Sequence, residues 1–183
     1  GFVCNKKPEG IIEMIGKLVR KSREYCADVE FAAVDATRSE PEFLYKALRT
    51  AVAAGASTVT ICDSAGTMMP YEFNNFVKEI YANVPELKEA ALAVKCSDEL
   101  SMAAACAVSA VKDGASEVDV VVSGGCAPKL ETASHIIRMR GDDCGFFSGI
   151  KYTELNRSIA QMNWISRSER SKTSAFDTGL SIS

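Results

Sequence analysis

Ala54-Gly55-Ala56-Ser57-Thr58-Val59-Thr60-Ile61-Cys62-Asp63 joins the end of an amphipathic helix to a buried strand, and this connection indicates the architecture of the chain. Gly55 ends the helix, and the β-branched and apolar run from Thr58 to Cys62 has the length of a strand. A similar helix exit, Asp113-Gly114-Ala115-Ser116, precedes a second apolar run. Two such exits indicate repeated α/β units and a parallel sheet.

Alternating helices and strands extend outward from this stretch in both directions. The spacing of apolar residues predicts helices over 8–26, 40–54, 70–82, 99–112 and 153–165. Strands are predicted over 29–33, 58–62, 90–94 and 117–122. Strands begin at intervals of about 30 residues, the length of a β-α-β unit. The order predicts an α/β fold in which crossover helices connect parallel strands, followed by a C-terminal helix and tail.

The number of strands restricts which α/β fold this can be. A nucleotide-binding sheet would carry a glycine-rich phosphate loop, and neither G-x-G-x-x-G nor G-x-x-x-x-G-K-[ST] occurs in the sequence. A (β/α)8 barrel has eight units and about 250 residues, whereas four strands are predicted here. We therefore expect a half barrel over 1–145, a post-barrel helix over 146–165 and a linker or arm over 166–183.

The composition is that of one soluble domain. The 183 residues are 47% apolar and 25% charged, and 21 basic against 24 acidic residues give a net charge of -3. No run of one charge sign predicts a nucleic-acid or membrane partner, and apolar stretches stay below the roughly 18 to 20 residues of a membrane span. We expect a cytoplasmic protein. Gly1-Phe2-Val3-Cys4 reads like part of a strand without an initiator methionine, which leads us to expect a fragment or a processed product.

Cysteine, histidine and aromatic residues give no separate site. The seven cysteines contain no C-x-x-C pair, so we expect reduced core side chains rather than a zinc or redox motif. His135 is the only histidine, which excludes a His-dependent triad within this chain and predicts a partly buried helix residue. Phe146, Phe147 and Trp164 are predicted to pack.

Two further motifs carry a resemblance to a known family. Asp35-Ala36-Thr37-Arg38-Ser39-Glu40-Pro41 and Ile61-Cys62-Asp63-Ser64-Ala65-Gly66 resemble the 2-isopropylmalate synthase and homocitrate synthase family, and the likeness covers residues 8 to about 165. It implies that the chain supplies strands five to eight of a (β/α)8 barrel. It also implies a Claisen-type condensation of acetyl-CoA with a 2-oxo acid, which needs a divalent metal and a base.

The sequence departs from this family where the metal would bind. The family has His-x-His on strand seven, and Lys95-Cys96-Ser97 stands there. An ammonium repels a cation and a hydroxyl is a poor substitute for imidazole, so no metal is expected. The family's glutamate before the first motif becomes Val34, and the loop after strand eight becomes Ser123-Gly124-Gly125 without polar ligands.

The polar residues that remain are the site candidates. The candidate catalytic residues are Asp35, Thr37, Arg38 and Lys95, and the candidate substrate-binding residues are Arg38, Asp63 and Ser64. Arg38 is expected either to bind a substrate carboxylate or to pair with Asp35 or Asp63. Lys95 is expected either to form a Schiff base or to pair with Asp63, Asp98 or Glu99. Asp98 and Glu99 would hold a weak magnesium-type site or lie in a solvated loop.

These observations leave three hypotheses about function. The first is a catalytically inactive, diverged half barrel that acts as a structural or regulatory assembly partner, with no cofactor. The second is the C-terminal half of an active acyltransferase, with divalent metal and acetyl-CoA, completed by another segment or chain. The third is a metal-free lyase or aldolase that uses Lys95. Because strands five and eight would present unpaired edges, a complementary barrel half or a homo-oligomer is the expected partner.

Overall fold

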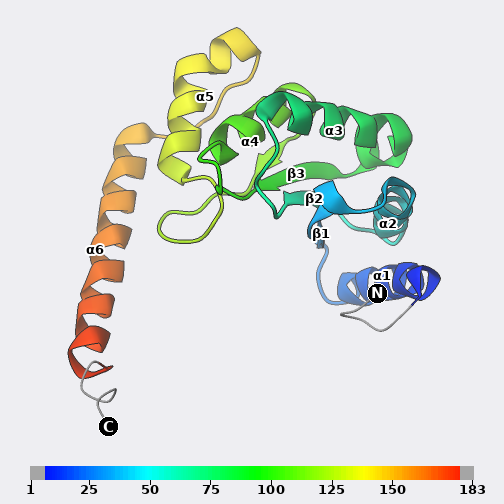
Figure 1. The fold of residues 1–183 in the computed structure, drawn as a ribbon, viewed down its shortest axis with the longest axis horizontal. Coiled ribbons are helices and arrows are strands. Elements are labelled where there is room, and N and C mark those ends of the chain that lie inside the picture. The colour runs from blue at the N-terminus through cyan, green and yellow to red at the C-terminus, as the bar shows by residue number, and fades with distance from the viewer. Residues whose placement is uncertain (1–6, 178–183) are drawn as a thin grey trace. The chain divides into compact units, whose positions relative to one another are not determined.

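The computed structural model describes residues 7–177, and these residues form two compact units (Figure 1). The first unit contains the residues up to Asp119 together with Cys126–Pro128, and the second contains Val120–Gly125 and the residues from Lys129 onward. This division falls earlier in the chain than the expected boundary at residue 145, which stays a prediction. No described helix is both long enough and apolar enough to cross a lipid bilayer.

The first unit is built on a four-stranded parallel sheet in the order β1-β2-β3-β4. The strands are β1 (Glu30–Ala33), β2 (Thr58–Asp63), β3 (Ala91–Cys96) and β4 (Glu117–Val118). In register, Ala33 lies beside Ile61 and Cys62 lies beside Lys95. The α/β class and the parallel sheet are therefore confirmed, with β1 and β4 at the edges of this sheet.

Four α-helices and two 3-10 helices connect or flank these strands. They are α1 (Pro8–Arg23), η1 (Ala36–Arg38), α2 (Pro41–Ala53), α3 (Pro70–Asn83), η2 (Pro85–Glu89) and α4 (Ala103–Lys112). Proline occupies the first turn of α1, α2 and α3, where its missing N–H costs no helical hydrogen bond. Helix α4 begins later than predicted, because Ser101 has a positive φ of 57° that interrupts the turn before it.

Both helix exits that the sequence repeats have the same backbone geometry. Gly55 and Gly114 have φ values of 102° and 115°, which side-chain-bearing residues rarely adopt. At each exit the next residue bonds back into its helix and the one after it bonds toward the neighbouring strand: Ala56 N to Ala51 O, Ala115 N to Ala110 O, Ser57 N to Val29 O and Ser116 N to Leu92 O. The repeated sequence therefore encodes a repeated connection from helix to strand.

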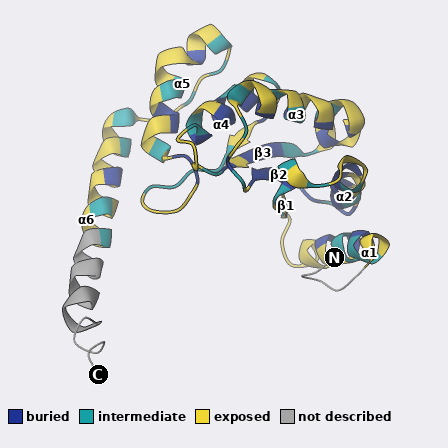
Figure 2. Ribbon diagram, viewed as in Figure 1, coloured by how far each residue is buried: buried dark blue, intermediate teal, exposed yellow. Residues whose placement is uncertain are grey.

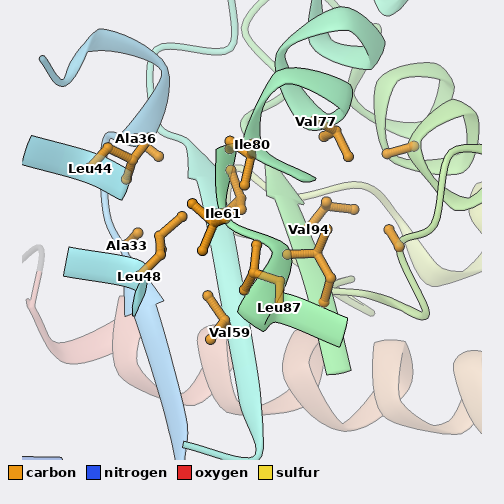
Figure 3. Packing of buried hydrophobic residues seen from close by; sticks show 14 of the residues in the cluster. Ala33, Ala36, Leu44, Leu48, Val59, Ile61, Val77, Ile80, Leu87 and Val94 are labelled. Atoms are coloured by element: carbon orange, nitrogen blue, oxygen red, sulfur yellow. The ribbon is translucent and has the colours of Figure 1, made fainter. Parts of the chain in front are cut away.

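The core of this unit lies between one face of the sheet and its helices. Strand residues Val59, Ile61 and Val94 pack in one cluster with helix residues that include Leu48 and Ile80 (Figure 3). Figure 2 shows the buried residues concentrated on β2, β3 and the sheet-facing sides of the helices. Every second strand residue therefore serves the core, and the alternate residues face the other way.

The second unit contains two helices, α5 (Leu130–Cys144) and α6 (Tyr152–Asp177). Helix α5 was not predicted. It ends at Gly145, which has a φ of 78°, and the Arg138 guanidinium lies 4.9 Å from the centre of the Tyr152 ring. Helix α6 continues beyond the predicted end at residue 165, so residues 166–177 of the expected linker or arm are helical. Residues 178–183 of that segment lie outside the described residues.

Several other expectations need correction. The fourth strand ends at Val118 instead of residue 122, because Val120–Gly125 leaves the sheet for the second unit, where Val121 bridges to Lys129. The side chains of His135, Phe147 and Trp164 are exposed, whereas we expected the histidine to be partly buried and the two aromatic residues to pack. Of the described cysteines, Cys62, Cys96 and Cys106 are buried, whereas Cys26 and Cys126 are exposed.

Replacing Leu48 with alanine tests the packing of the sheet against α2. Leu48 is fully buried, so Leu48→Ala should lower the free energy of unfolding by about 2–5 kcal/mol, measured by urea denaturation. Leu18→Ala is the matched control, because Leu18 is mostly exposed on α1 and should cost less than about 1 kcal/mol. Equal losses for both variants would contradict the core assignment.

Candidate functional site

A cavity of about 370 Å³ lies against the face of the sheet opposite the core. Its lining is Glu30, Ala32, Val34, Thr60, Cys62, Asp63, Ser64, Lys95, Ser97 and Asp119. Except for Asp63, these are the alternate residues of the strands and of their continuations, and we call the surface that they form the open face. The cavity brings together Asp63, Ser64 and Lys95, three of the predicted site residues.

Two hydrogen bonds connect the loop after β1 to the end of β2. The Thr37 hydroxyl donates to Asp63 Oδ1 over 2.9 Å, and the Asp35 backbone N–H donates to Ser64 Oγ over 3.0 Å. Asp63 is only 2% exposed, and its Oδ1 also accepts from Gly66 N over 3.2 Å. Asp35 itself has a left-handed backbone with a φ of 60°. These residues hold the two loops in a fixed arrangement, which is a positioning role.

Arg38 points to a partner within its own loop. Its Nε and one terminal nitrogen donate to the two carboxylate oxygens of Asp35, each over 2.8 Å. These hydrogen bonds raise the pKa of the Arg38 guanidinium above its ordinary value. The structure therefore has the ion pair with Asp35 that the sequence suggested, and Arg38 is not among the cavity-lining residues.

Gly66 allows the loop after β2 to contact the loop after β3. A Cβ at Gly66 would lie 2.5 Å from the Ser97 carbonyl oxygen, and the Gly66 backbone has a φ of 62°. Both features require glycine at this position. The Ser97 backbone N–H also donates to the Asp63 carbonyl over 2.9 Å, so Ser64 and Ser97 stand on adjoining strand ends.

Lys95 pairs with a residue that the sequence did not suggest. Its Nζ lies 3.8 Å from Asp119 Oδ2, and not beside Asp63, Asp98 or Glu99 as expected. Asp98 instead accepts a hydrogen bond from Ala103 N at the start of α4 over 3.0 Å. The Lys95 side chain is about half exposed, and its ion-pair partner in the structure is Asp119.

The residues around Lys95 do not fit a divalent metal. Lys95 and Ser97 stand where the family resemblance predicts two metal-binding histidines, and they supply an ammonium and a hydroxyl. Asp63 Oδ1 already accepts two hydrogen bonds. Within residues 7–177, no three His, Cys, Asp or Glu side chains are grouped so that they could hold a metal ion.

Three thiols close to this region are protected by burial. Loss of hydration raises the pKa of Cys62 and Cys96, and it raises the pKa of Cys106 from 9.0 to about 11. A thiol is a nucleophile or metal ligand only as the thiolate. Cys96 and Cys106 therefore act as small core residues, and Cys62 is a protonated thiol at the wall of the cavity near neutral pH.

Glu30, Thr60 and Asp119 belong to the cavity but were not predicted. The Thr60 hydroxyl donates to the Glu30 carboxylate across the first two strands, and Asp119 faces Lys95 across the last two. Strand alternation could have indicated Glu30 and Thr60, because each lies an even number of residues from another open-face residue of its strand. The position of Asp119 depends on the order of the strands in the sheet. The family resemblance did not draw attention to them.

The amino-acid sequence of this chain is similar to that of known proteins. The model of the HMGL-like family matches residues 2–141. The 2-isopropylmalate synthase of Aquifex aeolicus is 39% identical over 154 residues, which cover 81% of this chain and 29% of that protein. The 2-isopropylmalate synthase of Carboxydothermus hydrogenoformans is 36% identical over 156 residues, which cover 82% of this chain and 30% of that protein. The chain thus spans less than a third of the length of these curated relatives.

Solved structures share the fold at low sequence identity. The HMG-CoA lyase of Brucella melitensis superposes with a TM-score of 0.64 at 15% identity, covering 86% of this chain and 58% of that chain. The hydroxymethylglutaryl-CoA lyase of Pseudomonas aeruginosa gives a TM-score of 0.60 at 16% identity, covering 74% and 50%. The α/β arrangement of the chain therefore resembles that of the TIM-barrel proteins of this group.

Replacing Thr37 with valine tests the connection between the two loops. The change keeps the shape of the side chain but removes a donor to the buried Asp63 carboxylate, and should cost about 1–3 kcal/mol of unfolding free energy. Thr67→Val is the control, because Thr67 is exposed and should change stability by less than about 0.5 kcal/mol. Chemical denaturation measures both variants. A neutral Thr37→Val would mean that the hydrogen bond contributes nothing.

The buried Cys106 thiol predicts a pH dependence of stability. Because its pKa is raised to about 11 in the folded state, the unfolded chain loses this proton first as the pH rises above 9.0. Its stabilising contribution is complete below pH 9 and is lost between about pH 9 and 11. We expect Cys106→Ala to lose about 2 kcal/mol less stability than the parent over this interval, measured by urea unfolding at each pH. Cys26→Ala, at an exposed thiol, should follow the parent.

Proposed function

This chain belongs to the HMGL-like family, and from that premise we propose that it is a diverged half-barrel relative of the 2-isopropylmalate synthases that has lost metal-dependent condensation. In this proposal it serves as a structural or regulatory partner in an assembly. The observation that carries the proposal is the presence of Lys95 and Ser97 on the cavity at the end of β3, where the resemblance calls for two metal-binding imidazoles.

The need for a partner follows from the sheet. Among the described residues β1 and β4 each pair on one side only, and unpaired backbone groups on a strand edge favour association. The open face also carries exposed Ala32 and Val34. Closing such a sheet into a ring removes its edges, so a complementary barrel half or a second copy of the chain fits this surface.

A second candidate function has its own support. The loop residues Asp35 and Thr37 keep their hydrogen bonds to Ser64 and Asp63, so the polar arrangement at the strand ends is intact despite the loss of the histidines. In this alternative the chain is the C-terminal half of an acetyl-CoA-dependent condensing acyltransferase completed by another segment or chain. It requires a divalent metal held by ligands from elsewhere.

Metal analysis of the parent and of a restored variant tests the proposal. Purified protein should contain no stoichiometric zinc, manganese or magnesium, and should release no CoA from acetyl-CoA with any 2-oxo acid supplied. Lys95→His with Ser97→His restores two neutral imidazoles and should raise zinc affinity by at least about tenfold, measured by competition with a chromogenic chelator. Lys88→His with Ser109→His is the control away from the cavity.

Two outcomes would contradict the proposal. Bound transition metal together with CoA release by the parent, alone or with a complementary barrel segment, would establish the acyltransferase instead. Native mass measurement tests the assembly: a lone species at 19.7 kDa, in material isolated from the cells that naturally make it, would contradict a partner.

A further inference from the structure

We propose that Lys95, Ser97 and Ser64 form a metal-independent site for a small carboxylate, in which the ammonium supplies the positive charge. The three residues line one cavity and come from two adjacent strand ends. The inference rests on the proposed loss of the metal site, because it assigns the changed residues a binding role of their own. It concerns reversible binding and includes no covalent step.

The strand register places the three side chains together. Cys62 lies beside Lys95, and the hydrogen bond from Ser97 N to the Asp63 carbonyl continues this pairing to the strand ends. Ser64 and Ser97 therefore stand on neighbouring strands, which lie about 4.8 Å apart. Lys95 is two residues before Ser97 and faces the same side of the sheet.

All three side chains have hydrogen-bond donors that the described protein does not use. The Lys95 ammonium has three donors, and its one charged neighbour, Asp119, lies beyond hydrogen-bond distance at 3.8 Å. The Ser64 oxygen accepts from Asp35 N, which leaves its own O–H to donate. Within the described residues the Ser97 hydroxyl also has no partner. One cation and two hydroxyl donors at one cavity match the oxygens of a carboxylate.

The cavity also contains three carboxylates, Glu30, Asp63 and Asp119, which oppose the binding of an anion. Asp63 is buried and accepts hydrogen bonds from Thr37 and Gly66. The Glu30 carboxylate accepts a hydrogen bond from the Thr60 hydroxyl, and Thr60 lies two residues before Cys62, the register partner of Lys95. Asp119 is the direct competitor for Lys95. Their side chains are 39% and 52% exposed, and ion pairs between exposed groups are weak.

Because Asp119 competes with a bound carboxylate for Lys95, removing Lys95 should weaken carboxylate binding and removing the charge of Asp119 should strengthen it. Pyruvate is the probe and uncharged methyl pyruvate is the control, titrated in buffer freed of divalent metals with a chelating resin and observed by the NMR signals of the probe. Pyruvate should bind saturably with a Kd of about 1 mM, a plausible affinity for so small a ligand. Lys95→Met should weaken binding at least about tenfold, because a charged hydrogen-bonding partner is lost.

The competing carboxylate should act in the opposite sense. Asp119→Asn should strengthen pyruvate binding by about two- to tenfold, because the ammonium loses its protein counter-ion. Ser97→Ala should weaken pyruvate binding about threefold or more, because one hydroxyl donor is lost. This variant replaces Lys95→Met in the test if Lys95→Met does not fold. Lys88→Met is the control for general charge, because Lys88 is exposed outside the cavity, and it should leave the Kd unchanged.

The outcomes separate this inference from the proposed function. Absence of saturable binding, equal binding by Lys95→Met or equal binding of methyl pyruvate would overturn the carboxylate site while leaving the loss of metal untouched. Binding that depends on added zinc or magnesium would overturn both. A mass increase after borohydride reduction with pyruvate would reveal a Schiff base and overturn the non-covalent site.

Discussion

The two faces of the parallel strands have different functions, and this division underlies both the core and the cavity. On one face, Val59, Ile61 and Val94 lie against the helices and supply the apolar burial that stabilises the unit. On the other face, polar side chains such as Thr60, Lys95 and Asp119 border a cavity. Because alternate residues of a strand point in opposite directions, a substitution on the open face leaves the core contacts in place. The chemistry of this surface can therefore change without loss of the fold.

This separation explains how Lys95 and Ser97 can stand at the end of β3 without disturbing the core. Lys95 stands between the buried residues Val94 and Cys96, yet its own side chain is half exposed and pairs with Asp119. The hydrogen bonds between the loops after β1 and β2 join Thr37, Asp63 and Gly66 and do not involve the side chains of Lys95 and Ser97. A scaffold with this arrangement retains its shape when residues on its open face are replaced.

Local patterns predicted the elements whose stabilising residues are large and periodic. The strands with buried β-branched residues and the helices that begin at Pro8, Pro41 and Pro70 appear within a few residues of their expected bounds. Helix α5 escaped prediction because its buried residues are Ala133, Ser134 and Gly141, which form no apolar stripe. The pairing of Lys95 with Asp119 depends on which strand lies next in the sheet, and no local pattern contains that information. Trp164 is exposed although its size favours packing, because only tertiary contacts decide where a helix turns its faces.

The repeated helix exits at Gly55 and Gly114 have a consequence for how such proteins arise. At each exit, a short-range hydrogen bond ends the helix, and the next residue donates a hydrogen bond toward the preceding strand. Each of these two units therefore contains the contacts that connect its helix to the sheet. Copying one unit within a gene would add a strand at an edge without disturbing the bonds already made. A sheet built from such units can therefore accept another unit at an edge without a change in the exits that it already contains.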